Sequence, residues 1–354
     1  MKIKVALLDD DKNYLNRITS AFTNKYMDKL EIYSFSKLEL ALESLDEKKI
    51  DVFLASEEYE INAENIPKRC GFAYFVSGSG VEEIYGQRAI CKYQKAELIY
   101  RQILGIFADV SSGIAGVKFD NDVNVITFFG CSGGVGSSSL AAAYARRMAK
   151  KGKKVLYLNT ERLGNSEYFF SGEGNQTFSD VLYAIKSQKT NLSIKLESSI
   201  REDSTGVRFY QSSAMAMDIV EMAVEDFRVL LNTVKTTMDY EFIIIDAELT
   251  MDDMFHEISK NSTVIIIVGD GSEISNEKLV RLCDIVKIIE EQKDERIIAK
   301  MKLIYNKFSN KTNNVLRNIE IAELGGIQKY EHATTKQILE LLESKGEILD
   351  KIHL

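Results

Sequence analysis

The stretch Gly130-Cys131-Ser132-Gly133-Gly134-Val135-Gly136-Ser137-Ser138-Ser139 decides the fold of the larger part of this chain. It follows an apolar run, residues 123–129, that is typical of a buried strand, and it precedes an alanine-rich segment, residues 140–149, with helical character. Strand, glycine loop, hydroxyl residues and helix are the context in which such a loop binds phosphate. The lysine that usually follows the last glycine is absent, because Ser137 stands there.

The loop can hold phosphate through its backbone. A glycine loop at a helix N-terminus presents several N–H groups to an anion, and the helix dipole adds partial positive charge there. Glycine also lets the backbone approach the phosphates and adopt positive φ angles. We therefore expect the nucleotide-binding residues to be Ser132, Gly133, Gly134, Val135, Gly136, Ser137, Ser138 and Ser139. A tight glycine turn without a ligand is the alternative interpretation.

Two residues are expected to hold a metal ion beside the loop. Ser138 lies just inside the predicted helix, where a hydroxyl is placed to ligate Mg²⁺. Asp246 ends a second apolar run, residues 242–245, and is expected to bind the metal through a water molecule. The loop and this acid together indicate nucleotide binding more strongly than the loop alone.

The composition bounds the class of protein. A chain of 354 residues suggests two domains, and a formal net charge of -8 argues against a general nucleic-acid binder. No apolar run reaches the length needed to span a bilayer, and the N-terminus runs directly into a predicted strand, so no signal peptide is expected. The four cysteines form no CxxC pair, which is typical of free thiols in a reducing compartment. We therefore expect a soluble, cytoplasmic protein with no direct nucleic-acid partner.

The sequence divides into two predicted α/β domains, each with a parallel sheet. Residues 1–108 alternate predicted strands and helices, and such repeated βα units imply a sheet covered on both faces. A small, polar stretch, residues 109–122, is interpreted as a linker. Residues 123–354 form the second domain, whose continuous Ile/Val/Leu runs fit strands buried on both faces. Its predicted strands are 123–129, 154–159, 207–211, 242–246, 264–268, 302–306 and 327–330.

The second domain resembles the MinD/ParA class of P-loop ATPases. The loop of that family reads KGGxGK[ST], and Ser132–Ser138 aligns with it as SGGVGSS. Tyr240–Asp246 matches the family's Walker B strand, and Leu303–Lys307 matches the strand whose asparagine contacts adenine, which nominates Asn306. The resemblance implies a MinD/ParA-like P-loop fold with ATP and Mg²⁺ as cofactors.

Three positions depart from that family's pattern. Ser132 replaces the signature lysine that reaches across a dimer, Ser137 replaces the Walker lysine, and Asn159 replaces an aspartate that positions the attacking water. Loss of one charged hydrogen bond costs about 1.5–3 kcal/mol, whereas phosphoryl transfer depends more heavily on positioned positive charge. Asn159 and Asp246 are thus the candidate catalytic residues of a site expected to bind ATP–Mg²⁺ and to hydrolyse it slowly or not at all.

The first domain resembles a response-regulator receiver, which implies a CheY/flavodoxin-like fold. Asp9 and Asp10 end the first predicted strand, where receivers hold their metal-binding acids, and Lys92 ends the last one, where receivers hold a lysine. Ser77 occupies the position of a switching hydroxyl, and Ser56 that of the phosphoacceptor aspartate. Because a serine cannot form an aspartyl phosphate, we expect a pseudo-receiver kept for protein contacts, with the two acids either binding a metal or remaining solvated.

The pairing of an atypical receiver with a MinD-like domain resembles the TadZ/CpaE family, which localises the assembly machinery of tight-adherence (Flp-type) pili. The resemblance implies an ATP-bound homodimer that recruits pilus secretion and assembly proteins and a polar landmark protein, at a cell pole or at the inner membrane face. Three alternatives remain: an active ParA/MinD-type partitioning or positioning ATPase, a response regulator, and a scaffold with an empty loop. Co-purified nucleotide would exclude the scaffold, and the rate of ATP turnover would identify the partitioning ATPase.

Overall fold

The structure is a computed structural model that describes residues 2–78, 80–81, 83–110, 123–187, 191–309, 311, 313–317, 319–344 and 347–353. These residues form two compact units. The first comprises the described residues up to 110 together with those of segment 187–199, and the second comprises the others. Of the predicted linker 109–122, the residues from 111 on lie outside the described part of the chain.

The first unit is built on a six-stranded sheet with the order β2-β1-β3-β4-β6-β5. Neighbouring strands are parallel except β5 and β6, which form an antiparallel hairpin. The strands are β1 (Ile3–Leu8), β2 (Leu30–Phe35), β3 (Val52–Ser56), β4 (Gly71–Val76), β5 (Glu83–Ile84) and β6 (Gln87–Cys91). This order is that of a doubly wound fold, in which functional groups gather at the carboxyl ends of the strands. The receiver-like fold expected from the sequence is present.

The two faces of this sheet are covered by different elements. Helices α1 (Lys12–Tyr26) and α3 (Ala96–Val110) bury one apolar cluster against the first face. Helix α1 begins at the cap Asp11, whose carboxylate accepts two backbone N–H groups of the first turn, as capping residues do. Helix α2 (Leu38–Glu47) buries a second apolar cluster on the opposite face.

The connection between β3 and β4 differs from a regular βα unit. Between β3 and β4 the described residues contain only the short 3-10 helix η1 (Ala63–Asn65). Side chains of that connection, Tyr59, Ile61 and Ile66, pack on the α2 side of the sheet instead of a helix. The connection is rich in Glu and Asn and contains Pro67, so it has no apolar face with helical period to bury.

The second unit has an eight-stranded sheet with the order β14-β13-β12-β7-β11-β8-β10-β9. It is parallel except for β9, which runs antiparallel to β10. The strands are β7 (Asn124–Gly130), β8 (Val155–Asn159), β9 (Ile200–Glu202), β10 (Arg208–Tyr210), β11 (Phe242–Ala247), β12 (Val264–Gly269), β13 (Met301–Phe308) and β14 (Ala322–Gln328). Strand β7 lies between β11 and β12, so the glycine loop opens at the carboxyl edge of the sheet's centre, where such folds bind ligands.

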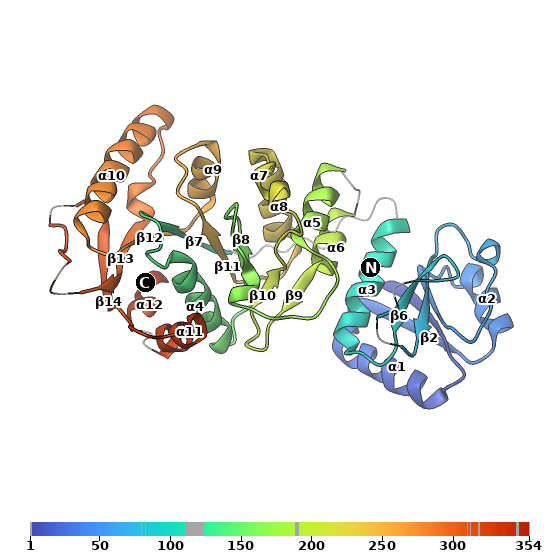
Figure 1. Ribbon diagram of the computed structural model, residues 1–354. Coiled ribbons are helices and arrows are strands. Elements are labelled where there is room, and N and C mark those ends of the chain that lie inside the picture. The colour runs from blue at the N-terminus through green and yellow to red at the C-terminus, as the bar shows by residue number, and fades with distance from the viewer. Residues whose placement is uncertain are drawn as a thin grey trace. The chain divides into compact units, whose positions relative to one another are not determined.

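Helices cover both faces of this second sheet (Figure 1). Helices α4 (Ser137–Lys150) and α11 (Thr335–Ser344) pack side by side on one face and share an apolar cluster with α12 (Glu347–Asp350). On the other face, Phe255 of α9 (Asp253–Asn261) contacts the ring of Phe129 on β7. The remaining helices of this unit are α5 (Phe178–Lys186), α7 (Ala216–Val220), α8 (Val224–Thr237), α10 (Glu273–Lys293), η2 (Ser166–Tyr168), η3 (Ile298–Lys300) and η4 (Lys351–His353), whereas α6 (Leu192–Ser198) belongs to the first unit.

Two strands differ from the sequence-based expectation. The last strand, β14, lies several residues before the predicted 327–330. Strand β9 was not expected, and its three residues gain their place by pairing with β10 rather than from an apolar run of their own.

Among the described residues, no helix is both long enough and apolar enough to cross a membrane.

Candidate functional site

The glycine loop between β7 and α4 opens onto free space. Gly134 and Gly136 have φ angles of 75° and 87°, a left-handed conformation that favours glycine. A Cβ atom on Gly133 or Gly134 would meet no other heavy atom within 4 Å. Gly133 has no positive φ angle that would require glycine. The missing side chain at Gly133 therefore serves no packing need, and it leaves room for an anion at the N-terminus of α4.

Asn306 and Lys307, at the carboxyl end of β13, fasten this loop. Nδ2 of Asn306 donates a hydrogen bond to the carbonyl oxygen of Val135 at 2.7 Å, and Nζ of Lys307 donates one to the carbonyl oxygen of Gly134 at 2.6 Å. A Cβ atom on Gly136 would lie 2.6 Å from Nδ2 of Asn306, so glycine is also required there for close approach. The structure thus places Asn306, nominated for adenine, against the loop backbone, and adds Lys307, which the sequence reasoning missed.

Asp246 lies fully buried at the end of β11, beside the loop. The hydroxyl of Tyr157 donates a hydrogen bond to its Oδ2 at 2.6 Å. Its Oδ1 has no hydrogen-bond partner among the described residues. Burial, and next to it the carboxylate of Glu161, raise the pKa of Asp246 to about 8. A buried acid with a free oxygen is costly unless another group satisfies it.

Glu161 adds a second carboxylate to this place. The hydroxyl of Ser138 lies 3.4 Å from each carboxylate oxygen of Glu161 and donates to them. Burial, followed by the charge of Glu248, raises the pKa of Glu161. Two carboxylates and a hydroxyl offer the oxygen ligands that Mg²⁺ prefers. The described residues hold no cluster of three or more His, Cys, Asp or Glu suited to a metal. A Mg²⁺ bound here would therefore take further ligands from water and phosphate.

Asn159, the other candidate catalytic residue, ends β8 and is tied into a local turn. Its Oδ1 accepts the backbone N–H of Glu161 at 2.9 Å, and its Nδ2 is buried without a partner in the described part of the chain. A Cβ atom on Gly164 would lie 2.4 Å from Oδ1 of Asn159, so a side chain there would force Asn159 to shift. Because an amide cannot accept a proton at neutral pH, Asn159 can orient a group by donating a hydrogen bond but cannot act as a base.

Small hydroxyl side chains stand where the two lysines of the resembled family are absent. Ser137 is buried in the first turn of α4, and Ser132 is half-buried in the loop. Ser138 and Ser139 are also half-buried in that turn. Arg146 and Arg147, farther along α4, form ion pairs with acidic residues of α11 and α12. Those pairs direct both arginines toward the C-terminal helices.

A second polar site lies at the carboxyl edge of the first unit's sheet. Nζ of Lys92 pairs with Oδ2 of Asp9 at 3.2 Å, with 7% and 0% of these side chains exposed. Asp9 is therefore not a solvated acid, which corrects one of the two interpretations made from the sequence, whereas Asp10 is exposed. Ser56 ends β3 with a buried hydroxyl that has no partner among the described residues. Ser77 donates its backbone N–H to Glu57 at 2.7 Å.

Two known protein families match the chain. Residues 1–108 match the family described as the TadZ-like receiver domain. Residues 123–299 match the family described as an AAA domain. No curated protein sequence matches.

Solved structures are similar to the second part of the chain. A ParA family ATPase from Chlorobium tepidum TLS superimposes with a TM-score of 0.53 and 20% identity, covering 66% of this chain and 98% of that one. A plasmid partition protein from Borrelia burgdorferi B31, solved with bound AMPPNP, gives a TM-score of 0.50 and 19% identity over 66% of this chain and 98% of that one. At these identities the likeness shows a shared fold, the ParA/MinD-like fold expected from the glycine loop.

Proposed function

Because this chain belongs to the AAA-domain family through residues 123–299 and matches the TadZ-like receiver-domain family over residues 1–108, we propose that it is an assembly factor of a tight-adherence pilus that holds ATP and Mg²⁺ with little or no hydrolysis. Its working form in this proposal is a homodimer. Residues 1–108 act as its pseudo-receiver and residues 123–354 as its nucleotide-binding domain, joined by 109–122.

The observation that carries the proposal is the open glycine loop beside an unsatisfied carboxylate. Gly133 leaves space that no protein atom fills, and Oδ1 of the buried Asp246 has no partner in the described residues. The loop N–H groups would take the phosphates. Ser138, Asp246 and Glu161 would hold the cation, which supplies charge neutralisation between the phosphates when it is bound. Asn306 and Lys307 keep the loop in the conformation that this requires.

Slow turnover follows from the same residues. The loop binds anions mainly through backbone dipoles, which are present with or without a lysine. Transfer of the terminal phosphoryl group needs further positive charge placed around that group. Ser132 and Ser137 carry no positive charge, and Asn159 has an amide in place of the carboxylate that would position water. The protein should therefore bind ATP without using it rapidly.

An exposed apolar surface beside the site supports the homodimer. Large side chains from the segments that follow β8 and β10 are exposed: Leu163, Tyr168, Met215, Met217 and Val220. A hydrogen bond from the hydroxyl of Ser212 to the carboxylate of Glu167 joins these two segments. Exposed apolar groups of this size commonly mark a protein–protein interface. We propose that a second copy covers them when nucleotide is bound, leaving the receiver-like unit to contact pilus assembly proteins and a polar landmark.

Two measurements on the purified full chain test the proposal. Isothermal titration with ATP and Mg²⁺ should give about one nucleotide bound per chain, and sedimentation should show a shift from monomer to dimer upon addition of ATP. Phosphate release should stay near background. Absence of nucleotide binding would exclude the proposal in favour of an empty scaffold. Rapid turnover would favour an active partitioning ATPase instead.

A further inference from the structure

Helix α6 lies within the sequence of the AAA domain but packs with the first compact unit. Its residues, Leu192–Ser198, fall inside the region that matches the AAA domain, yet they belong to the first compact unit. A helix of 7 residues is far below the length at which helices are stable alone. The packing of α6 along α3 within the first unit must therefore hold it in place.

The apolar side of α6 completes the core of the first unit. Ile194 packs against the apolar cluster that lies under α1 and α3. Leu196, two residues later, is fully buried. Burial of such side chains contributes about 1.5–3 kcal/mol each when it is complete. Ile194 is therefore the apolar side chain of α6 that contacts this cluster.

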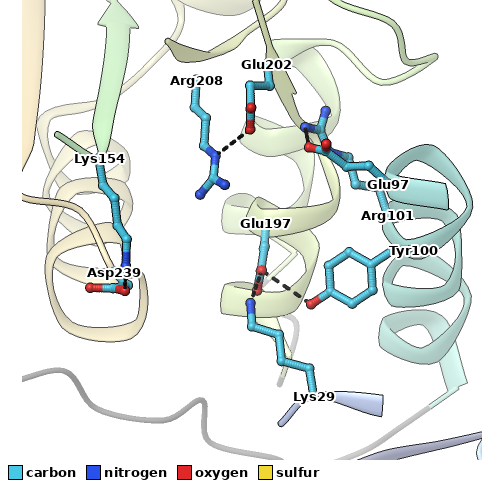
Figure 2. Close-up of polar contacts among 9 residues, drawn as sticks. All are labelled: Lys29, Glu97, Tyr100, Arg101, Lys154, Glu197, Glu202, Arg208 and Asp239. Atoms are coloured by element: carbon cyan, nitrogen blue, oxygen red, sulfur yellow. Dashed lines mark hydrogen bonds and ion pairs between the residues drawn. The ribbon is translucent and has the colours of Figure 1, made fainter. Parts of the chain in front are cut away.

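Glu197 provides the polar contact (Figure 2). Its Oε1 lies 2.5 Å from Nζ of Lys29 and 3.5 Å from the hydroxyl of Tyr100. The ring of Tyr100 stacks on that of Tyr26 with centroids 3.9 Å apart, and Nζ of Lys29 lies over the Tyr100 ring. Lys29 thus contacts both the Tyr100 ring and the Glu197 carboxylate, and its ammonium group can pair with that carboxylate.

The strand that follows α6 is the edge strand of the sheet that carries the nucleotide site. Ser199 alone separates α6 from β9, which pairs with β10, and β10 pairs with β8. A hydrogen bond of 3.0 Å between Arg208 and Glu202 also ties β10 to β9 (Figure 2). Strand β8 carries Tyr157, the hydrogen-bond donor to Asp246. The strands that continue α6 thus belong to the sheet that positions the site's buried carboxylate.

We propose that residues 191–199 are a resident ligand of the α1–α3 surface of the receiver-like unit, with Ile194 as the apolar anchor and Glu197 as the polar one. While α6 is seated, this surface is closed to other proteins. A partner that docks there must displace α6 and needs the same chemistry, an apolar side chain three positions before an acidic one on a helix. Segment 187–199 thereby belongs to the first unit, although the residues on both sides of it belong to the second.

The exposure of the side chains indicates how much Ile194 and Glu197 each contribute to holding α6. The side chains of Lys29 and Glu197 are 52% and 35% exposed, and ion pairs of this kind contribute about 0–1 kcal/mol. Removing the charge would therefore change little. Reversing it places two cations together and should loosen α6 more, and an acid in place of Ile194 should loosen it most.

Hydrogen exchange on the nucleotide-free full chain tests this inference without depending on the proposed function. Glu197→Lys should make the amides of α6 exchange about fivefold faster, and Ile194→Asp should do so more strongly, while the amides of β1 stay protected. The charge swap Lys29→Glu with Glu197→Lys should restore slow exchange. Glu291→Lys, a charge reversal at an exposed position of α10, should leave α6 unchanged.

Three results would overturn the inference. The first is exchange of α6 in the unaltered protein at the rate of an unstructured peptide. The second is unaltered exchange of α6 in both single variants. The third is a charge swap that fails to restore protection, which would remove Glu197 from the role of polar anchor.

Discussion

The ammonium group of Lys307 donates a hydrogen bond to the carbonyl oxygen of Gly134, 2.6 Å away. Lys307 itself has a φ angle of 55°, an uncommon value for a residue with a side chain. The loop that lacks its own lysine is thus held by a lysine from another strand.

Lys307→Met should weaken ATP binding about three- to tenfold. The bond is charge-assisted, which is worth about 1.5–3 kcal/mol when shielded, and its exposure reduces that value. Methionine keeps the apolar stem, so the unfolding free energy should change little. Titration calorimetry would measure the affinity, with Lys336→Met on α11 as the matched control. Equal affinities of the two variants would contradict the role of Lys307.

Ser137→Lys should raise ATP affinity about 10- to 150-fold, because it restores one charged hydrogen bond worth about 1.5–3 kcal/mol. Turnover should remain slow, since Ser132 and Asn159 are unchanged. Ser137→Ala is the matched control and should bind ATP like the unaltered protein. A lysine variant that binds no better would show that the loop does not hold the phosphates at this position.

Gly133→Ala should separate ligand binding from stability. The added methyl group would meet no protein atom within 4 Å, so the unfolding free energy should stay within about 0.5 kcal/mol of the original. The same methyl group would enter the space that we assign to phosphate, and nucleotide affinity should fall at least about tenfold. Chemical denaturation and nucleotide titration on the same preparation would check both. Unchanged affinity would mean that the ligand does not approach Gly133.

Nucleotide-free protein should lose stability as the pH rises from about 4 to about 8. The folded state holds a proton on Asp246 up to a pKa of about 8, whereas the unfolded chain releases it near 3.8. Between these values the folded state binds more protons, so the unfolding free energy falls with rising pH. Tyr157, Ser138 and Glu161 face Asp246, and Glu248 faces Glu161.

Denaturant unfolding at several pH values would measure this dependence, with Asp246→Asn as the control. The variant lacks the titrating group, so the unfolding free energy of the original protein should fall relative to that of the variant across this range. Parallel pH profiles of the two proteins would contradict the assignment of the proton to Asp246.

Lys92→Met should destabilise the receiver-like unit by about 3–5 kcal/mol, because it leaves the buried carboxylate of Asp9 without a compensating positive charge, although the backbone N–H of Asp11 still donates to it. The double variant Asp9→Asn with Lys92→Met removes both charges and should recover a large part of that loss. Thermal unfolding would compare the two. A double variant no more stable than the single one would show that the ion pair is not the source of the effect.

The sequence predicted the parts of the fold whose signal is local. The continuous apolar runs before Gly130 and Asp246 are buried parallel strands, as expected, and the loop between strand and helix has positive φ angles at Gly134 and Gly136. The strand β9 could not be predicted in this way, because it has no apolar run of its own and exists through its pairing with β10. Residues 186–204 show some helical spacing, typical of a surface helix. Their sequence does not indicate that α6 packs against α3.

The sequence also predicted those site residues that lie in the motifs of the resembled family. Three of them, Ser138, Asp246 and Asn306, lie at the loop or beside it. Lys307 was indicated only by its position next to Asn306. No sequence pattern indicates that the side chain of Lys307 reaches the carbonyl oxygen of Gly134. That contact depends on the order of β13, β12 and β7 in the sheet, a long-range property.

The most direct test of the central claim is to measure ATP binding and ATP turnover on one preparation of the full chain with Mg²⁺. The account predicts saturable binding of about one ATP per chain, lost on removal of Mg²⁺ or in Asp246→Asn, with phosphate release close to that of free ATP. No binding, or turnover at about 1 per second or faster, as in typical enzymes, would contradict it.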